Sequence, residues 1–189
     1  MNLFPHLRRL AAGLLLIAAA GAIASAPAER DGQHDFDDSF GAWKVEVARL
    51  DRPLTGSSTW LGYQGTHTIT PLWNGRGNVG VLDVSGPAGR IEAMSPRLYN
   101  PATRQWSVRY ASSRDGAMGV PHVGRFAQGR GVFIAQDTLG EKVILVRNVY
   151  WAESADQHRF EVAYSEDGGL TWETNWKMTE TRIAKGASQ

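Results

Sequence analysis

Few side chains beyond the first 28 residues could carry acid–base or metal chemistry. The histidines there are His34, His67, His122 and His158, and none is spaced as a ligand pair within one element. We therefore expect no metal and no cofactor. His67 and Glu180 become candidates for acid–base catalysis if the fold brings them beside an arginine. Haem binding through one inward histidine is a further alternative.

Other catalytic and cofactor motifs are missing or stand in the wrong context. The run Gly75-Arg-Gly77-Asn-Val-Gly80 has the spacing of a dinucleotide-binding loop, but an extended segment follows it where a helix is required. We interpret it as a turn. The chain has no G-x-S-x-G elbow, P-loop or H-E-x-x-H motif. These observations favour a binding module over an enzyme.

Aromatic side chains and two arginines are the better candidates for contact with a small molecule. Arg97 and Arg147 lie at strand positions that could face inward, where a guanidinium would meet a carboxylate ligand. An outward face or an internal salt bridge is the alternative for both. We expect His67 and Glu180 beside an aromatic lining, part of which would be ordinary core. The aromatic candidates are Trp60, Tyr99, Trp106, Tyr110, Trp151, Tyr164 and Trp176.

The stretch Ser165-Glu-Asp167-Gly-Gly169-Leu-Thr171-Trp172 has the pattern of an Asp-box, known from sialidases. A sialidase propeller needs several such blades of about 40–50 residues each, and one complete copy occurs here. We therefore predict a structural β-hairpin turn. Its glycines supply positive φ, Asp167 binds the backbone of its own turn, and Trp172 is structural.

The elements that must position these residues are short strands. Alternating or continuous apolar runs, separated by turn signals, recur at close and regular spacing. The expected strands are Phe40–Val47, Thr59–Thr70, Asn78–Ser85, Ile91–Tyr99 with a bulge at Pro96, Trp106–Ser112, Pro121–Phe126, Val132–Thr138, Val143–Trp151, His158–Ser165 and Leu170–Arg182. This pattern predicts an all-β, antiparallel up-and-down barrel of about ten strands, because closure removes exposed edges. A sandwich is the alternative.

Residues 1–28 have the features of a secretory signal peptide. Arg8 and Arg9 precede an apolar run from Leu10 to Ile23, and small residues follow. The run is shorter than a membrane span and rich in Ala and Gly. We therefore expect one exported domain, residues 29–189, that begins with a loose acidic arm over residues 29–38. Its location would be periplasmic or extracellular, without stable membrane insertion.

Charge and cysteine content limit the partners of the mature chain. The whole chain has 20 basic and 19 acidic residues, and cleavage removes Arg8 and Arg9, which leaves 18 basic residues. The net charge of the mature chain is therefore about −1. A chain without excess positive charge has no basic surface to attract nucleic acid. The chain has no cysteine, so the exported domain must be stable without disulfides. The expected partner is a small apolar ligand, and the sequence leaves the oligomeric state open.

A larger set of motifs resembles a known family. The set comprises Gly41-Ala-Trp43 near the start, Leu98-Tyr-Asn-Pro101-Ala-Thr-Arg-Gln-Trp106, Val123-Gly-Arg-Phe126, and the stretch from Asp167 through Trp176 to Arg182. It is similar to a bacterial family of uncharacterised lipocalin-like (calycin) proteins, over residues 36 to 183. The resemblance implies a lipocalin-like barrel without established catalytic residues.

In that fold an arginine of the last strand lies across the tryptophan of the first, so Arg182 and Trp43 are expected to meet. Glu180 departs from the family pattern, because an apolar residue is expected there. The leading hypothesis is an exported barrel that binds a small, largely apolar molecule in its interior. An isomerase or lyase in the same cavity is the alternative, with haem binding as a further one.

The signal peptide yields a direct prediction. Export should remove the apolar run, so the mature protein should begin at Ser25 or Glu29. N-terminal sequencing of protein recovered from the producing cell would test this. Recovery of a membrane-bound form that retains Met1 would contradict the prediction.

Overall fold

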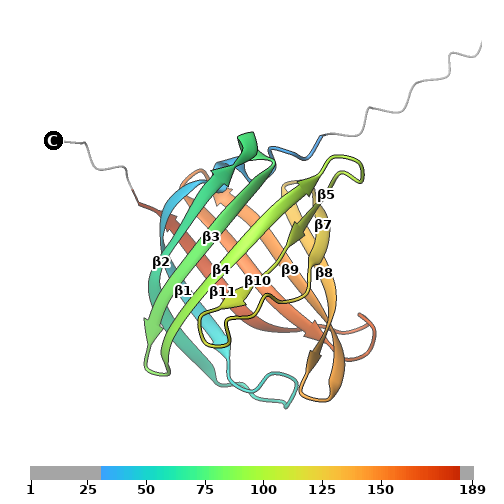
Figure 1. Cartoon of the computed structure of the whole chain (residues 1–189). Helices are drawn as coiled ribbons and strands as arrows, with labels where there is room; N and C mark the ends of the chain where they lie inside the picture. The colour runs from blue at the N-terminus through green and yellow to red at the C-terminus, as the bar shows by residue number, and fades with distance from the viewer. Residues whose placement is uncertain (1–30, 184–189) are drawn as a thin grey trace, which may run out of the picture. The chain divides into compact units, whose positions relative to one another are not determined.

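Eleven strands make up most of residues 31–183, the part of the chain that the computed structural model describes (Figure 1). The predicted signal peptide, residues 1–28, lies outside the described residues. The strands are β1 (Gly41–Leu50), β2 (Trp60–Leu72), β3 (Gly77–Gly86), β4 (Gly89–Asn100), β5 (Gln105–Val108), β6 (Ala111–Ser112), β7 (His122–Ala127), β8 (Arg130–Leu139), β9 (Lys142–Ser154), β10 (Gln157–Ser165) and β11 (Glu173–Arg182).

The strands pair antiparallel, and the sheet closes on itself. Its order is β3-β2-β1-β11-β10-β9-β8-β7-β5-β4, and β4 pairs back with β3. These ten strands form the barrel, while β6 is a short addition beside β4. The predicted antiparallel barrel of about ten strands is confirmed. The sandwich alternative is wrong. A sandwich consists of two separate sheets packed face to face, whereas these strands form one sheet that closes into a ring.

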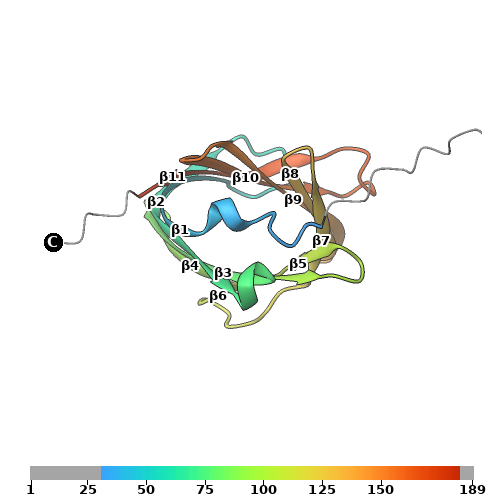
Figure 2. The same ribbon diagram turned by 90° about the horizontal axis from the view of Figure 1, so that it is seen from above.

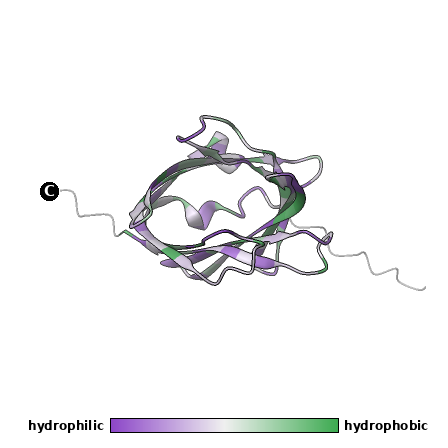
Figure 3. Cartoon of the chain, turned by 90° about the horizontal axis from the view of Figure 1, so that it is seen from below, coloured by the Kyte–Doolittle hydropathy of each residue, from purple (hydrophilic) through white to green (hydrophobic). Residues whose placement is uncertain are grey.

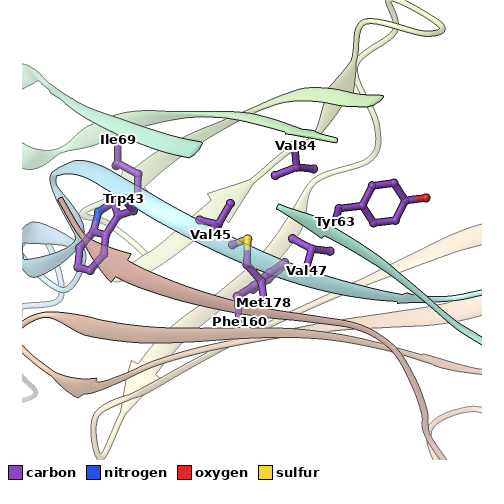
Figure 4. Close-up of a cluster of buried hydrophobic side chains, with 8 residues drawn as sticks. All are labelled: Trp43, Val45, Val47, Tyr63, Ile69, Val84, Phe160 and Met178. Carbon is purple, nitrogen blue, oxygen red and sulfur yellow. The ribbon is translucent and has the colours of Figure 1, made fainter. Parts of the chain in front are cut away.

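The alternation in the sequence determines which side chains face inward. In β1, Trp43, Val45 and Val47 are buried, whereas Lys44 and Glu46 between them are exposed. These inward residues form one core cluster with Met178 of the adjacent strand β11 and Phe160 of β10 beyond it (Figure 4). The period of two thus separates the interior of the barrel from solvent.

Pro96 does not produce the predicted bulge on the β3 side. It pairs with Val79 in an unbroken register along β3 and β4. The irregularity lies on the opposite side of β4, where pairing with β5 stops at Arg97 and pairing with β6 resumes at Met94. The N–H of Arg109 donates to the Pro96 carbonyl at 3.1 Å. Proline has no N–H to donate, so this ladder is interrupted beside it.

The expected loose arm at residues 29–38 is wrong for the described part of that range. Residues 31–40 run across one end of the barrel and include the 3-10 helix η1 (Asp37–Ser39) (Figure 2). Figure 3 shows the same segment lying across the far end when the barrel is viewed from the opposite side. Phe36 is almost fully buried, and its ring centroid lies 4.9 Å from that of Trp106. The buried ring of Phe36 therefore anchors residues 31–40 at this end of the barrel. We call this segment the N-terminal plug.

Trp43 and Arg182 meet as the lipocalin-like arrangement implies. They are paired across β1 and β11, and the guanidinium carbon lies 4.1 Å from the indole centroid. The indole Nε1 donates to the Ser39 carbonyl at 2.8 Å. Arg182 also donates to the carbonyls of Asp38 and Phe40, at 2.6 and 2.9 Å. The expected contact is confirmed, and it ties the plug to the last strand.

The Asp-box forms the turn between β10 and β11. One Asp167 oxygen accepts from the Thr171 hydroxyl at 2.6 Å, and the other accepts from the Ser165 hydroxyl at 2.7 Å. The Thr171 N–H donates to the same carboxylate at 2.9 Å. Hydrogen bonds from Thr171 and Ser165 lower the pKa of Asp167 to about 2. These contacts are those of a structural hairpin turn.

The contact between Trp43 and Arg182 predicts energetic coupling. Trp43→Ala should destabilise the fold by about 3–5 kcal/mol, because the indole is fully buried. Arg182→Met should remove a cation–π contact worth up to about 2 kcal/mol. Urea denaturation of a double-mutant cycle should show coupling of at least about 0.5 kcal/mol. A second cycle that combines Trp60→Ala with Arg182→Met is the control and should show no coupling. If the losses of unfolding free energy from Trp43→Ala and Arg182→Met are additive, the prediction is contradicted.

The Asp167 carboxylate should give a pH-dependent contribution to stability. Its folded pKa is about 2, below the ordinary value of 3.8, so the contribution is present above about pH 4 and is lost between there and about pH 2. Asp167→Asn should lower the thermal midpoint at neutral pH, and the difference from wild type should shrink through that window. Asp115→Asn, in an exposed loop, is the matched control. A constant difference down to pH 2 would contradict the assignment.

Candidate functional site

A cavity of about 340 Å³ lies inside the barrel. Its wall is mostly apolar and includes Leu82, Ile91, Val162 and Met178, which come from strands on opposite sides of the ring. The volume is at the lower end of the range for small-molecule sites, which begins at about 300 Å³. The barrel interior is therefore partly open rather than completely filled by side chains.

Five of the residues predicted to contact a ligand line this cavity. They are His67, Arg97, Tyr110, Tyr164 and Trp176. Each lies on the inward parity of its strand or at a break in the wall, as Tyr110 does between β5 and β6. Glu180 lies behind His67 and is joined to it by a hydrogen bond.

Two predicted lining residues belong to the closed end instead. Tyr99 and Trp106 pack with Phe36 in a second core cluster. The indole Nε1 of Trp106 donates to the Gly32 carbonyl at 2.9 Å, and the Tyr99 hydroxyl donates to Asp31 at 2.7 Å. Both residues therefore hold the N-terminal plug and do not contact the cavity.

Three further candidates lie outside the cavity wall. Lys177 places its Nζ 4.9 Å from the ring of Trp60, and Arg130 lies 4.3 Å from the ring of Trp151. The expected inward position of Arg147 is wrong, because its guanidinium lies 4.3 Å from the ring of Trp172. Its neighbours Val146 and Asn148 line the cavity, so strand alternation directs Arg147 to the other face.

His67 and Glu180 form a buried pair at the cavity wall. The distance from His67 Nδ1 to a Glu180 oxygen is 2.5 Å, and both residues are about 5% exposed or less. Burial raises the pKa of Glu180, but the hydrogen bond from His67 and the positive charges nearby outweigh burial and hold it below its usual value. The carboxylate therefore stays ionised and fixes the orientation of the imidazole.

Arg97 is the buried cation of this site, with an exposed fraction of 2%. It donates to the side-chain oxygens of Asn78 and Ser95, both at 3.3 Å. Its guanidinium carbon also lies 4.9 Å from the ring of Phe36 and 5.3 Å from that of Tyr150. The N-terminal plug thus covers one side of the guanidinium, and the cavity lies beside it.

Three polar lining residues on β7 and β9 were missed by sequence reasoning. His122, Asn148 and Tyr150 all line the cavity. Tyr150 and Tyr110 share a hydrogen bond between their hydroxyls. Burial raises the pKa of both phenols, so they stay protonated and available as donors. The alternation of Val146, Asn148 and Tyr150 along β9 is the signal that could have identified two of the three.

Between residues 31 and 183, no group of three or more His, Asp or Glu side chains is placed to bind a metal ion. No helix in the same range is long and apolar enough to cross a membrane.

Comparison with solved structures agrees with a lipocalin-like barrel. The S-type phycobiliprotein lyase CPES from Guillardia theta matches with a TM-score of 0.57 and 12% identity, over 82% of this chain and 93% of that chain. A redesigned β-barrel, mFAP1, bound to DFHBI, has a TM-score of 0.43 and 12% identity, over 81% of this chain and 100% of that chain. At this identity the lyase shows a shared fold, and the lower score of mFAP1 carries no argument.

Sequence comparison adds no family. No protein-family model matches the chain, and no curated protein matches it. The lipocalin-like fold is therefore established by the strand topology and the lyase comparison, while membership of a particular bacterial family stays a prediction.

The buried pair of His67 and Glu180 predicts a characteristic mutational pattern. Glu180→Leu should destabilise the protein by about 3–5 kcal/mol, because it removes one partner of a buried pair. The double variant His67→Leu/Glu180→Leu should recover much of that loss, since neither polar group is left behind. Urea unfolding at neutral pH measures both, and a double variant no more stable than Glu180→Leu would contradict the prediction.

Proposed function

We propose that this protein binds a small, largely apolar molecule inside its barrel. The observation that carries the proposal is the cavity of about 340 Å³, with walls that are apolar over most of their surface and only a few polar groups. Sites for small molecules combine such walls with a few fixed polar groups. Here the polar groups are held by hydrogen bonds within the barrel, as for His67 and Arg97.

The location of this function is part of the proposal. The features of residues 1–28 favour export, which would give the barrel a periplasmic or extracellular role. Native mass spectrometry of protein recovered from the producing cell would identify a bound molecule. An absorption spectrum of the same sample would test the haem alternative through its Soret band.

Catalysis is a second candidate, favoured by the pair of His67 and Glu180. A histidine that lines a cavity and is oriented by a buried carboxylate has the arrangement of a general base. A proton shift within a bound molecule, of isomerase or lyase type, is the chemistry that this pair could perform. Incubation of the co-purified molecule with the protein in deuterated water should then exchange a C–H proton, and His67→Gln should abolish the exchange.

Interior binding can be tested with the neutral fluorophore N-phenyl-1-naphthylamine. Val162 lines the cavity, so Val162→Trp should fill much of the space and abolish the increase in fluorescence. Val143→Trp is the matched control, because Val143 lies on β9 and is 61% exposed. The control should bind as wild type does. Unchanged binding by Val162→Trp, with the fold intact by circular dichroism, would place the probe outside the cavity and contradict the proposal.

A further inference from the structure

Arg97 has too few acceptors for a cation at this depth. A guanidinium has five N–H donors and keeps its charge in proteins. Arg97 is 2% exposed, and its acceptors are the neutral oxygens of Asn78 and Ser95, both at 3.3 Å, together with the Tyr150 hydroxyl. Its Nε has no hydrogen-bond partner among residues 31–183. A buried charge without a hydrogen-bonded counter-charge is costly. The fold therefore maintains an incompletely satisfied cation beside the cavity.

A second observation points to the same kind of ligand. Asn148 lines the cavity and is 1% exposed, and its Nδ2 has no partner within the described residues. The indole Nε1 of Trp176 is buried and unpartnered in the same way. Val162 of β10 is paired with Asn148 of β9 on one side and with Trp176 of β11 on the other. Two strands of the cavity wall, β9 and β11, thus carry N–H donors without an acceptor among the described residues. A ligand with acceptor atoms would supply one.

Nearby acidic groups do not supply those acceptors. The carboxylate of Glu180 attracts the Arg97 guanidinium through its charge, but it is hydrogen-bonded to His67, and His67 rather than Glu180 lines the cavity. Asp137 also lines the cavity, but it lies six residues along β8 from Gly131, the partner of Tyr150. Because a strand rises about 3.4 Å per residue, Asp137 is about 20 Å along β8 from the level of Tyr150. Asp137 therefore lies far from Arg97, and Glu180 is the acidic group near Arg97 at the plugged end.

We propose that Arg97 binds the carboxylate of an apolar carboxylic acid, whose hydrocarbon part lies along the apolar wall that Leu82 and Ile91 provide. A carboxylate is acceptor-only and forms charge-assisted, often bidentate hydrogen bonds with a guanidinium. A carboxylate supplies acceptors to Arg97 and adds less negative charge beside Glu180 than a phosphate dianion would. This inference rests on the proposed interior binding site and names the class of ligand that the site selects.

The test compares decanoate with decanamide, two probes of nearly equal shape that differ in charge. Each displaces N-phenyl-1-naphthylamine from wild type at about pH 7, where the acid is ionised. Decanoate should bind tighter by about tenfold or more, the factor that one charge-assisted hydrogen bond supplies. Arg97→Met should lose this preference while it keeps its affinity for decanamide. Arg147→Met, which alters a guanidinium outside the cavity, should keep the preference.

The outcomes distinguish failure of the carboxylate site from failure of interior binding. Equal affinities of wild type for both probes, or a preference that survives Arg97→Met, would overturn the carboxylate site and leave interior binding intact. Carbon-13 NMR of carboxyl-labelled decanoate reports binding to wild type directly, so the test stands even if Arg97→Met fails to fold. Absence of a bound signal, together with absence of fluorophore binding, would overturn both proposals.

Discussion

The closed ladder of backbone hydrogen bonds is the constraint on which the rest of this structure depends. Pairing of β3 with β4 completes the ring, so the ten barrel strands each have two neighbours. Once the ring is closed, strand alternation alone decides whether a side chain meets solvent or the common interior. Arg97 and Arg147 illustrate the rule, since one lies at the cavity and the other lies over Trp172 on the outside.

The plugged end concentrates the polar groups of the interior. Phe36 covers Arg97 from one side, and Glu180, His67 and His158 lie close enough for their charges to influence one another. Low dielectric strengthens these interactions and also raises the cost of any group left unpaired. The apolar part of the cavity extends away from this cluster. The interior therefore combines a cluster of interacting charges at its plugged end with walls that are mostly apolar.

The sequence predicted the fold well because strand periodicity is a local signal. Nine of the ten expected strands each match one strand, although β11 begins at Glu173 and not at Leu170. The expected strand Trp106–Ser112 is divided into β5 and β6, and the Trp43–Arg182 contact followed from the family resemblance. The site was predicted less completely, because a cavity wall depends on non-local register. Periodicity assigned Trp106 to the interior correctly, but it could not show that Phe36 and the N-terminal segment would fill that end. Asn148 and Tyr150 went unnoticed, although their alternation with Val146 along β9 places both on the inward face.

The contact of Arg182 with the plug also has a consequence for how the molecule folds. Its hydrogen bonds to Phe40 and Asp38 span 142 and 144 residues, nearly the whole of the described chain. Contacts of such high sequence separation slow folding, because most of the loop-closure entropy is lost before they form. During synthesis, β1 must wait for β11 to emerge, and the partial sheet keeps an unpaired edge until then.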